Sequence, residues 1–315
     1  MDSLYFCSSK ITYNMKKIIT IFAMVLCCAA SVVKGQVFFI DGVAYRPINE
    51  VSIQEGSYFS GDVVIPDVIN KDGQGYWVTE ISRGAFDKSN GVTSIKLGLY
   101  VKTIAPYAIY GTFSRIKLNM NLAKVDPLSF YGCPNLEYID ASECSYLADD
   151  EGVLYDKDMS ELKIYPIKKK NEKYVIPEGV RKILHYAFWE TQIVELDIPS
   201  SIQVVGGFDN APYLKTIVVR AINPPSLFIN SVDTRVLREC TIYVPEESIE
   251  AYQQHKDWGK FNKIKGIGEY VSVKSVRNPK MPKGYYDIKG VRHNELQDGV
   301  NIVVEEEGGV KKIVK

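Results

Sequence analysis

VTEISRGAFDKSNGVTSIKL, residues 78–97, contains the spacing of apolar residues that decides the fold. The apolar positions that define this spacing are Val78, Ile81, Ala85, Phe86, Val92, Ile95 and Leu97. Four more copies of the spacing begin at Val101, Leu122, Val180 and Ile202, and adjacent copies start 23, 21 and 22 residues apart. Each copy closes with apolar-x-x-apolar-x-apolar, which alternates like a strand with one buried face.

A period in the low twenties is typical of leucine-rich repeats. One such unit is too small to bury its own apolar face, so neighbouring units must stack. We therefore predict a mostly β fold, a leucine-rich-repeat solenoid of short strands and turns.

The segments outside the repeats are expected to close this stack. An open stack exposes apolar surface and unpaired strand edges. We expect a β-type N-terminal cap, then the repeats, then a strand-helix C-terminal cap in which Pro245 and two acids start a helix. The expected ranges are 36–77 for the first cap, 78–220 for the repeats with a hairpin inserted at 147–176, and 221–270 for the second cap, with its helix at about 246–257.

At these residues the chain resembles the BspA-type leucine-rich repeat family of gut and oral anaerobic bacteria. The resemblance rests on 78–97 and on two further copies, LAKVDPLSFYGCPNLEYIDA (122–141) and VRKILHYAFWETQIVELDIP (180–199). GVLYDKDMSELKIYP (152–166) is similar to a hairpin that this family inserts between repeats, and CTIYVPEESIEAYQQHKDWGKF (240–261) to its closing strand and helix. The chain departs from the family pattern at two kinds of position. Cys133 is the one Cys at the repeat's Cys position, and Ile109 replaces the usual Phe in the second copy.

The N-terminus resembles a secretion signal. Met15-Lys16-Lys17 begins a basic region, an apolar stretch covers 18–30, and small residues precede a cleavage site near Gly35. We interpret 1–35 as upstream residues and signal peptide, and expect a secreted or outer-surface protein of a bacterium. A transmembrane anchor and lipidation at Cys27 are the alternatives, and both are disfavoured, the first because the run is short and Lys34 follows it.

The C-terminus reads as a polar linker, 271–284, and a small β tail, 285–315. Strands are expected at 285–288, 300–304 and 310–314, separated by glycines. The tail resembles terminal segments of exported proteins from the same bacteria, where such tails are associated with secretion or surface attachment. A β appendage packed on the solenoid end is the equally weighted alternative.

Three cysteines remain after cleavage, Cys133, Cys144 and Cys240. An odd number does not form a disulfide framework, and a buried free Cys packs like a small apolar residue. We expect three unpaired thiols, with a Cys133–Cys144 bridge as the alternative.

The sequence offers no catalytic constellation, so we predict that the protein is not an enzyme and has no cofactor or metal. Its three histidines have no metal-ligand spacing, and phosphate-binding and nucleophile motifs are lacking. The acidic residues of 149–158 are the densest cluster, and calcium there is an alternative without the usual loop spacing.

The repeats offer a binding surface instead. Residues between the inward positions of each closing strand should point outward on a continuous sheet. The candidate site residues on this face are Lys96, Arg115, Lys117, Tyr138, Asp140, Glu195 and Asp197, with Ser94, Thr216 and Val218 on the same outward ladder. The first two strands are basic and the next two acidic, so the face is expected to be polarised along its length, with ordinary solvation as the alternative interpretation.

These observations favour a non-enzymatic binding module. The chain has 38 basic and 38 acidic residues, which gives no reason to expect nucleic acid as a partner. The resemblance implies adhesion, through protein–protein interaction, to an extracellular protein such as a host matrix protein or to another bacterium. The alternatives are a structural component of the cell surface and a glycan-binding accessory protein. We do not expect the chain to span a membrane.

Overall fold

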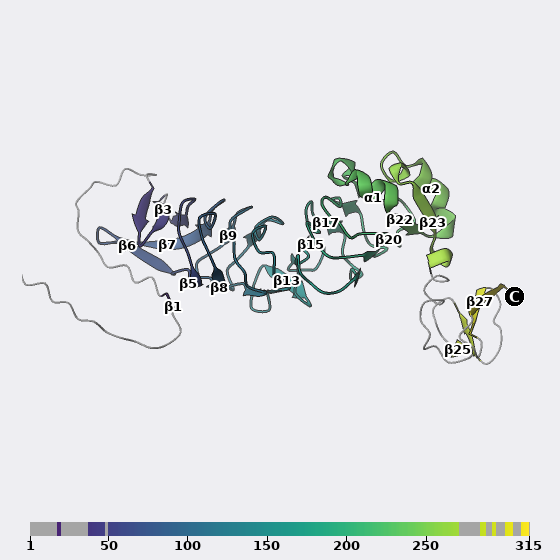
Figure 1. Ribbon diagram of the computed structural model, residues 1–315, viewed down its shortest axis with the longest axis horizontal. Helices are drawn as coiled ribbons and strands as arrows, with labels where there is room; N and C mark the ends of the chain where they lie inside the picture. Colours follow the sequence, from purple (N-terminus) through teal and green to yellow (C-terminus); the bar gives the residue numbers. More distant parts are fainter. Residues whose placement is uncertain are drawn as a thin grey trace, which may run out of the picture.

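The computed structural model describes residues 37–47 and 50–270, together with five short strand segments at 18–19, 284–287, 292–293, 300–304 and 310–314. Most elements are short strands, and helices are few (Figure 1). The repeat region forms an elongated row of turns, each beside the next in the sequence. The signal peptide prediction lies outside the described residues except for Ile18–Ile19, and the linker 271–284 lies almost entirely outside them.

Each repeat contributes one strand to each of two sheets. The closing apolar-x-apolar segment forms a strand of one sheet, and the V/I that follows the opening residue by three positions ends a strand of the other, which has two residues in every repeat except the first. The first sheet is ordered β1 (Ile18–Ile19), β5 (Gly61–Val64), β8 (Val92–Lys96), β10 (Arg115–Lys117) and β12 (Tyr138–Asp140), all parallel. The second contains β2 (Phe38–Ile40), β3 (Val43–Pro47), β4 (Val51–Ile53), β7 (Gln74–Ile81), β9 (Thr103–Ile104) and β11 (Lys124–Val125), with β6 (Val68–Lys71) paired to β7.

An inserted hairpin separates these sheets from a second pair. In the third sheet β14 (Val153–Asp156) pairs antiparallel with β13 (Leu147–Asp150) and β15 (Glu161–Ile164), so 152–166 forms a hairpin. The same sheet continues in parallel through β17 (Lys182–Ile183), β19 (Val204–Val205) and β21 (Ser226–Leu227). The fourth sheet is parallel and contains β16 (Lys173–Val175), β18 (Glu195–Ile198), β20 (Thr216–Val219), β22 (Thr241–Val244) and β23 (Lys263–Gly266).

The core is divided in the same place as the sheets. One cluster of buried side chains extends from Val43 to Ile164 and a second from Val153 to Phe261, so the two overlap only at the hairpin. The inward positions predicted from the spacing are buried in every repeat, and Phe86, Phe188 and Phe208 are among the largest fully buried side chains. Hydrophobic burial between neighbouring repeats therefore supplies the core that one repeat lacks.

The helical segment near the end of the repeats is shorter than predicted. The expected helix at about 246–257 is a 3-10 turn η2 (Glu246–Ser248) followed by α2 (Ile249–Gln254). It ends there because His255 has an extended backbone and its Nδ1 accepts hydrogen bonds from the N–H groups of Asp257 and Trp258, at 3.2 and 3.3 Å. Other helical elements are η1 (Ile229–Ser231), α1 (Thr234–Glu239) and η3 (Trp258–Lys260), and residues 267–270 are also helical.

Tyr252 and Trp258 pack against the segment that follows the last repeat. Both are fully buried. The Tyr252 hydroxyl donates to the carbonyl of Ala221 at 2.8 Å, and Trp258 Nε1 donates to the carbonyl of Pro225 at 2.8 Å. These bonds satisfy the polar ends of two large aromatic side chains, which lets them cover the apolar end of the stack.

The tail contains a four-stranded antiparallel sheet. Its order is β25 (Arg292–His293), β24 (Gly284–Asp287), β26 (Val300–Val304) and β27 (Val310–Val314). Three of these strands lie within one residue of the predicted ranges, and β25 was not predicted because it has only two residues.

The packing argument predicts a large cost for Phe188→Ala. Phe188 is 1% exposed and its ring centroid lies 5.5 Å from that of Tyr165 in the hairpin, so truncation opens a cavity between two repeats. We expect a loss of about 3–5 kcal/mol in the free energy of unfolding, measured by chemical denaturation. The control Tyr213→Ala, at a residue that is 53% exposed, should change it by less than about 0.5 kcal/mol. Equal effects of the two variants would contradict the argument.

Candidate functional site

The first sheet brings together five of the seven predicted site residues. In β8, β10 and β12 the inward residues Ile95, Ile116 and Ile139 are buried. Strand pairing aligns their outward neighbours, since Lys96 pairs with Lys117, Lys117 with Asp140, and Arg115 with Tyr138. Lys96, Arg115, Lys117, Tyr138 and Asp140 therefore share one face, which we call the first sheet face.

Ion pairs neutralise most of this face. Arg115 lies 2.8 Å from Asp140 and its guanidinium lies 4.1 Å from the centroid of the Tyr138 ring. Lys117 Nζ lies 2.6 Å from Glu143 Oε1. Lys96 is exposed and has no ion-pair partner among the described residues. The face thus carries one uncompensated positive charge beside a set of satisfied charges.

The other two predicted site residues lie on a different sheet, and the expectation that both are exposed is wrong. Asp197 in β18 is 2% exposed. Arg220 donates to both of its carboxylate oxygens, at 2.7 and 2.8 Å, and Lys173 Nζ lies 3.7 Å away. Glu195 pairs with Lys173 at 2.9 Å and accepts a hydrogen bond from the hydroxyl of Tyr270.

The alternation of inward and outward residues along a strand could not predict which side chains cover Glu195 and Asp197. Tyr270 follows β23, the last strand of the fourth sheet, and its side chain contacts Glu195 in β18. Burial together with this hydrogen bond raises the pKa of Tyr270 to about 12. Val218, also placed on the outward ladder, is fully buried, whereas Thr216 is half-buried and Ser94 is exposed. The predicted acidic half of the face is therefore closed by salt bridges and a tyrosine.

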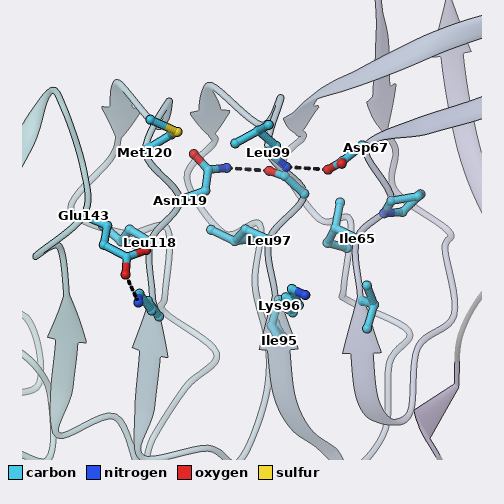
Figure 2. A pocket seen from close by; sticks show the side chains of 14 residues that line it. Ile65, Asp67, Ile95, Lys96, Leu97, Leu99, Leu118, Asn119, Met120 and Glu143 are labelled. Atoms are coloured by element: carbon cyan, nitrogen blue, oxygen red, sulfur yellow. Dashed lines mark hydrogen bonds and ion pairs between the residues drawn. The ribbon is translucent and has the colours of Figure 1, made fainter.

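A groove of about 700 Å³ borders the first sheet face (Figure 2). It follows the carboxyl ends of β5, β8 and β10, and its floor includes the buried side chains of Ile65, Leu97 and Leu118. Leu99 and Met120, 41% and 49% exposed, lie along it. Lys96, Lys117 and Glu143 also line it, so the groove and the charged face are continuous.

The wall of the groove is held in place by hydrogen bonds to the backbone. Asp67 Oδ1 accepts from the N–H of Leu99 at 2.6 Å, and Asn119 Nδ2 donates to the carbonyl of Gly98 at 2.6 Å, as Figure 2 shows. A Cβ on Gly98 would lie 2.7 Å from the carbonyl oxygen of Pro66. Only glycine allows this close approach of two turns, which makes the groove a preformed feature.

Sequence analysis missed the apolar part of this site. The predicted site residues were all outward residues of the strands, whereas Leu99 and Met120 lie in the turns that follow the strands. Leu99 and Met120 each stand two residues after the last buried residue of their repeats, Leu97 and Leu118, and two such apolar residues in consecutive repeats were the available signal.

The acidic residues considered for calcium serve the hairpin instead. Asp149 accepts hydrogen bonds from the N–H groups of Ala141 and Gly152, at 2.7 and 3.1 Å. Asp156 accepts from the Ser160 hydroxyl at 2.8 Å. In the part of the chain that the structure describes, no group of three or more His, Cys, Asp or Glu side chains is placed to hold a metal ion.

The three predicted free thiols are free and buried, and no Cys133–Cys144 bridge is formed. Burial raises the pKa of Cys133 and of Cys240 to about 12, so neither is a reactive thiolate near neutral pH. Cys144 donates to the carbonyl of Leu122 at 3.0 Å. Cys133 and Cys144 pack in the first core cluster and Cys240 in the second.

The geometry around Asp140 predicts a pH effect. Its pKa is lowered to about 2, first by the Ser142 hydroxyl, which donates at 2.6 Å, and then by the Arg115 guanidinium. A pKa below the unfolded value of about 3.9 means that Asp140 stabilises the fold above about pH 4 and loses this effect as the pH falls toward 2. We expect Ser142→Ala to raise the pKa of Asp140 more than Arg115→Met does, measured by NMR titration of the carboxyl carbon. Lys124→Met, in the second sheet, is the control and should leave the pKa of Asp140 unchanged. If neither Ser142→Ala nor Arg115→Met shifts this pKa, Ser142 and Arg115 are not its cause.

The chain matches a known protein family. A family model for the BspA type leucine rich repeat region matches six copies, over residues 79–208 and 165–242, which together cover more than half of the chain. No curated protein matches. Within the described residues, no helix has both the length and the apolar character needed to cross a membrane.

Several solved structures are similar in fold at low identity. The pneumococcal vaccine antigen PcpA is 13% identical, with 68% of this chain and 83% of that chain covered and a TM-score of 0.39. A leucine-rich repeat protein from Bacteroides ovatus is 20% identical, with 72% and 61% covered and a TM-score of 0.38, so the chain spans less than two thirds of it. A leucine rich cell surface protein from Faecalibacterium prausnitzii is 11% identical, with 73% and 94% covered and a TM-score of 0.30.

The repeat spacing, the sheets that it builds and the six matched copies lead to one conclusion: the chain belongs to the BspA-type leucine-rich repeat family.

Proposed function

We propose that this protein is a non-enzymatic, extracellular binding module, and that a protein partner docks on the groove and the first sheet face. The observation that carries this proposal is the continuity between an apolar, preformed groove and the free positive charge of Lys96. Exposed apolar side chains beside the groove, Leu99 and Met120, offer surface that a partner would remove from water. Adhesion to an extracellular protein is the biological role that fits such a surface.

The partner should present an acidic side chain next to an apolar one. A positive charge at the edge of an apolar groove steers the approach of an acidic surface and fixes its register. Lys117 adds to this field only in part, since Glu143 lies 2.6 Å from it. Glu195 and Asp197 are engaged by Lys173 and Arg220, so they are not part of the proposed site.

The remaining assignments belong to the same proposal. The repeats form a solenoid whose ends are capped by residues 37–77 and by the helical segment that contains α1 and α2. The protein is secreted or displayed on the outer surface of a bacterium after removal of a signal peptide near Gly35. The tail serves secretion or surface attachment.

Charge reversal tests the site. The mature chain, beginning at Gln36, is screened against matrix proteins and glycans alongside the variant Lys96→Glu plus Lys117→Glu. We expect a protein ligand, with at least about a tenfold loss of affinity in the variant and a slower association at higher salt. Leu99→Ser plus Met120→Ser should also weaken binding, because it removes apolar contact without changing charge.

The matched control is Lys124→Glu plus Lys215→Glu, which reverses two exposed lysines outside the groove and the first sheet face. Protein binding that survives both site variants would refute the proposed location. A ligand found only among glycans would favour a glycan-binding accessory protein, and the absence of any ligand would favour a structural surface component.

A further inference from the structure

A second surface is formed by a continuous row of aromatic side chains. It follows the strands β9, β11 and β17, whereas the groove follows β5, β8 and β10. Ring contacts connect its members from the second repeat to the segment after β21. We call this set the aromatic row; its members are Tyr107, Tyr131, Trp189, Tyr186, His185 and Phe228.

The row arises from two positions that flank the buried Ala-Phe pair of each repeat. Tyr107-Ala-Ile-Tyr110 and Tyr186-Ala-Phe-Trp189 carry an aromatic residue at both positions, and Tyr131 fills the second position in the third repeat. Backbone bonds place the turns in line, since the N–H of Gly84 donates to the carbonyl of Tyr107 and the N–H of Tyr107 to that of Leu128, each at 2.9 Å. The stacking of repeats thus converts a sequence pattern into a line of rings.

Two tyrosines of the row have a backbone conformation that favours glycine. Tyr107 and Tyr186 have φ values of +56° and +62°, and Gly84, at the matching position of the first repeat, has +69°. A side chain in this left-handed region is disfavoured, because Cβ crowds the following carbonyl. The turn itself therefore does not require tyrosine, and such strain is characteristic of functional positions.

Three pairs of rings in the row meet edge to face, so the row is not a flat platform. Tyr107 and Tyr131 are 5.2 Å apart at 68°, Tyr186 and Trp189 5.5 Å apart at 75°, and His185 and Phe228 4.3 Å apart at 62°. Tyr131, Tyr186 and Phe228 are each more than a third exposed. An extended sugar chain would favour coplanar exposed rings, whereas an uneven surface of edge-to-face rings suits compact apolar rings such as proline.

The hydroxyl groups of Tyr107, Tyr131 and Tyr186 give the row hydrogen-bond donors. Trp189 Nε1 is buried and has no hydrogen-bond partner among the described residues, and Trp189 lines a cavity of about 20 Å³ together with Tyr131 and Tyr186. The nearby carboxylates are engaged: Asp126 accepts from the N–H of Leu128 at 2.9 Å, and Glu190 from Asn210 at 3.0 Å. A ligand with free carbonyl groups can accept hydrogen bonds from these tyrosine hydroxyl groups.

One end of the row is cationic. The guanidinium of Arg83 is exposed, lies 4.6 Å from the centroid of the Tyr107 ring, and has no ion pair among the described residues. A ligand that extends along the row toward the first repeat would meet this charge, so an acidic residue at that end of the ligand is complementary to it.

We propose that the aromatic row binds a proline-rich segment of a partner protein in the polyproline II conformation, with an acidic residue at one end facing Arg83. This conformation leaves every backbone carbonyl free to accept, and it is ordered before binding, so little entropy is lost. Aromatic-lined surfaces are a recurring way to recognise such segments. This surface is separate from the groove, and the proposal stands independently of the function proposed above.

The test uses the full chain and synthetic proline-rich peptides that carry one glutamate at either end, or none, with a glycine-serine peptide of equal length as the negative probe. Binding is measured by calorimetry. We expect saturable binding of the proline-rich peptides, tighter for one glutamate position than for the other. Tyr107→Gly plus Tyr186→Gly should weaken it at least about tenfold without lowering the thermal midpoint, because glycine suits both φ values.

Three further variants separate the parts of the proposal. Arg83→Gln should abolish the preference for the glutamate position while the uncharged peptide binds as before. Trp189→Ala removes the ring that connects Tyr131 to Tyr186 and should weaken binding several-fold. Tyr146→Ala plus Tyr213→Ala, at tyrosines that are 56% and 53% exposed and lie outside the row, is the matched control and should have no effect.

Each contrary result would overturn the proposal. These are the absence of peptide binding, equal binding of the glycine-serine peptide, and binding that the tyrosine variant retains. A loss of folding in that variant would assign the row a structural role, and peptide binding lost in Lys96→Glu plus Lys117→Glu would place the ligand in the groove. Binding of a glycan, but of no peptide, through Tyr107 and Tyr186 would replace the proposal with carbohydrate recognition.

Discussion

The structure depends on the burial of each repeat's apolar face by the repeats on either side of it. A unit of about 22 residues has too little interior of its own, so its core residues contact the next unit as much as their own. Backbone bonds follow the same direction: the N–H of Lys102 donates to the carbonyl of Thr79, and the N–H of Ala123 donates to that of Lys102. Hydrophobic burial and hydrogen bonding are therefore both satisfied between repeats, and neither is complete within one.

This constraint separates positions that are fixed from positions that are free. The inward V/I/L positions and the pair at Ala-Phe remain buried in every repeat, and a change in their size is felt by two neighbours. The outward strand positions, the turn after each strand and the two positions around Ala-Phe are not used by the stack. The groove is formed by the turn after each strand and the aromatic row by the positions around Ala-Phe, so both proposed binding surfaces lie outside the inward positions of the repeat.

The inward half of the structure could be predicted from the sequence because periodicity directly reports which side chains are buried. Phe86, Phe188 and Leu196 are where the spacing placed them. The two-residue strands such as β9 leave too little pattern to detect. Exposure was harder to predict: Asp197 has the same outward position as Lys96, but Arg220 and Lys173 cover it. Contacts with residues distant in sequence decide exposure, from Arg220 and Lys173 at Asp197 and from Tyr270 at Glu195, and spacing within a repeat contains no information about them.

The contrast between Lys96 and Asp197 also explains why the two sheet faces differ in what they can bind. A charge that is withdrawn from water is stable only when its partners are complete, and Asp197 has two bonds from one guanidinium and a second cation close by. Displacing those partners would leave a buried carboxylate uncompensated. The free energy lost in this way would reduce the affinity of any ligand that bound there. Lys96 remains hydrated and exposed, and pairing it with an acidic group breaks no existing bond. The face before the inserted hairpin is thus available to a partner, whereas the face after it is committed to holding its own strands and Tyr270 together.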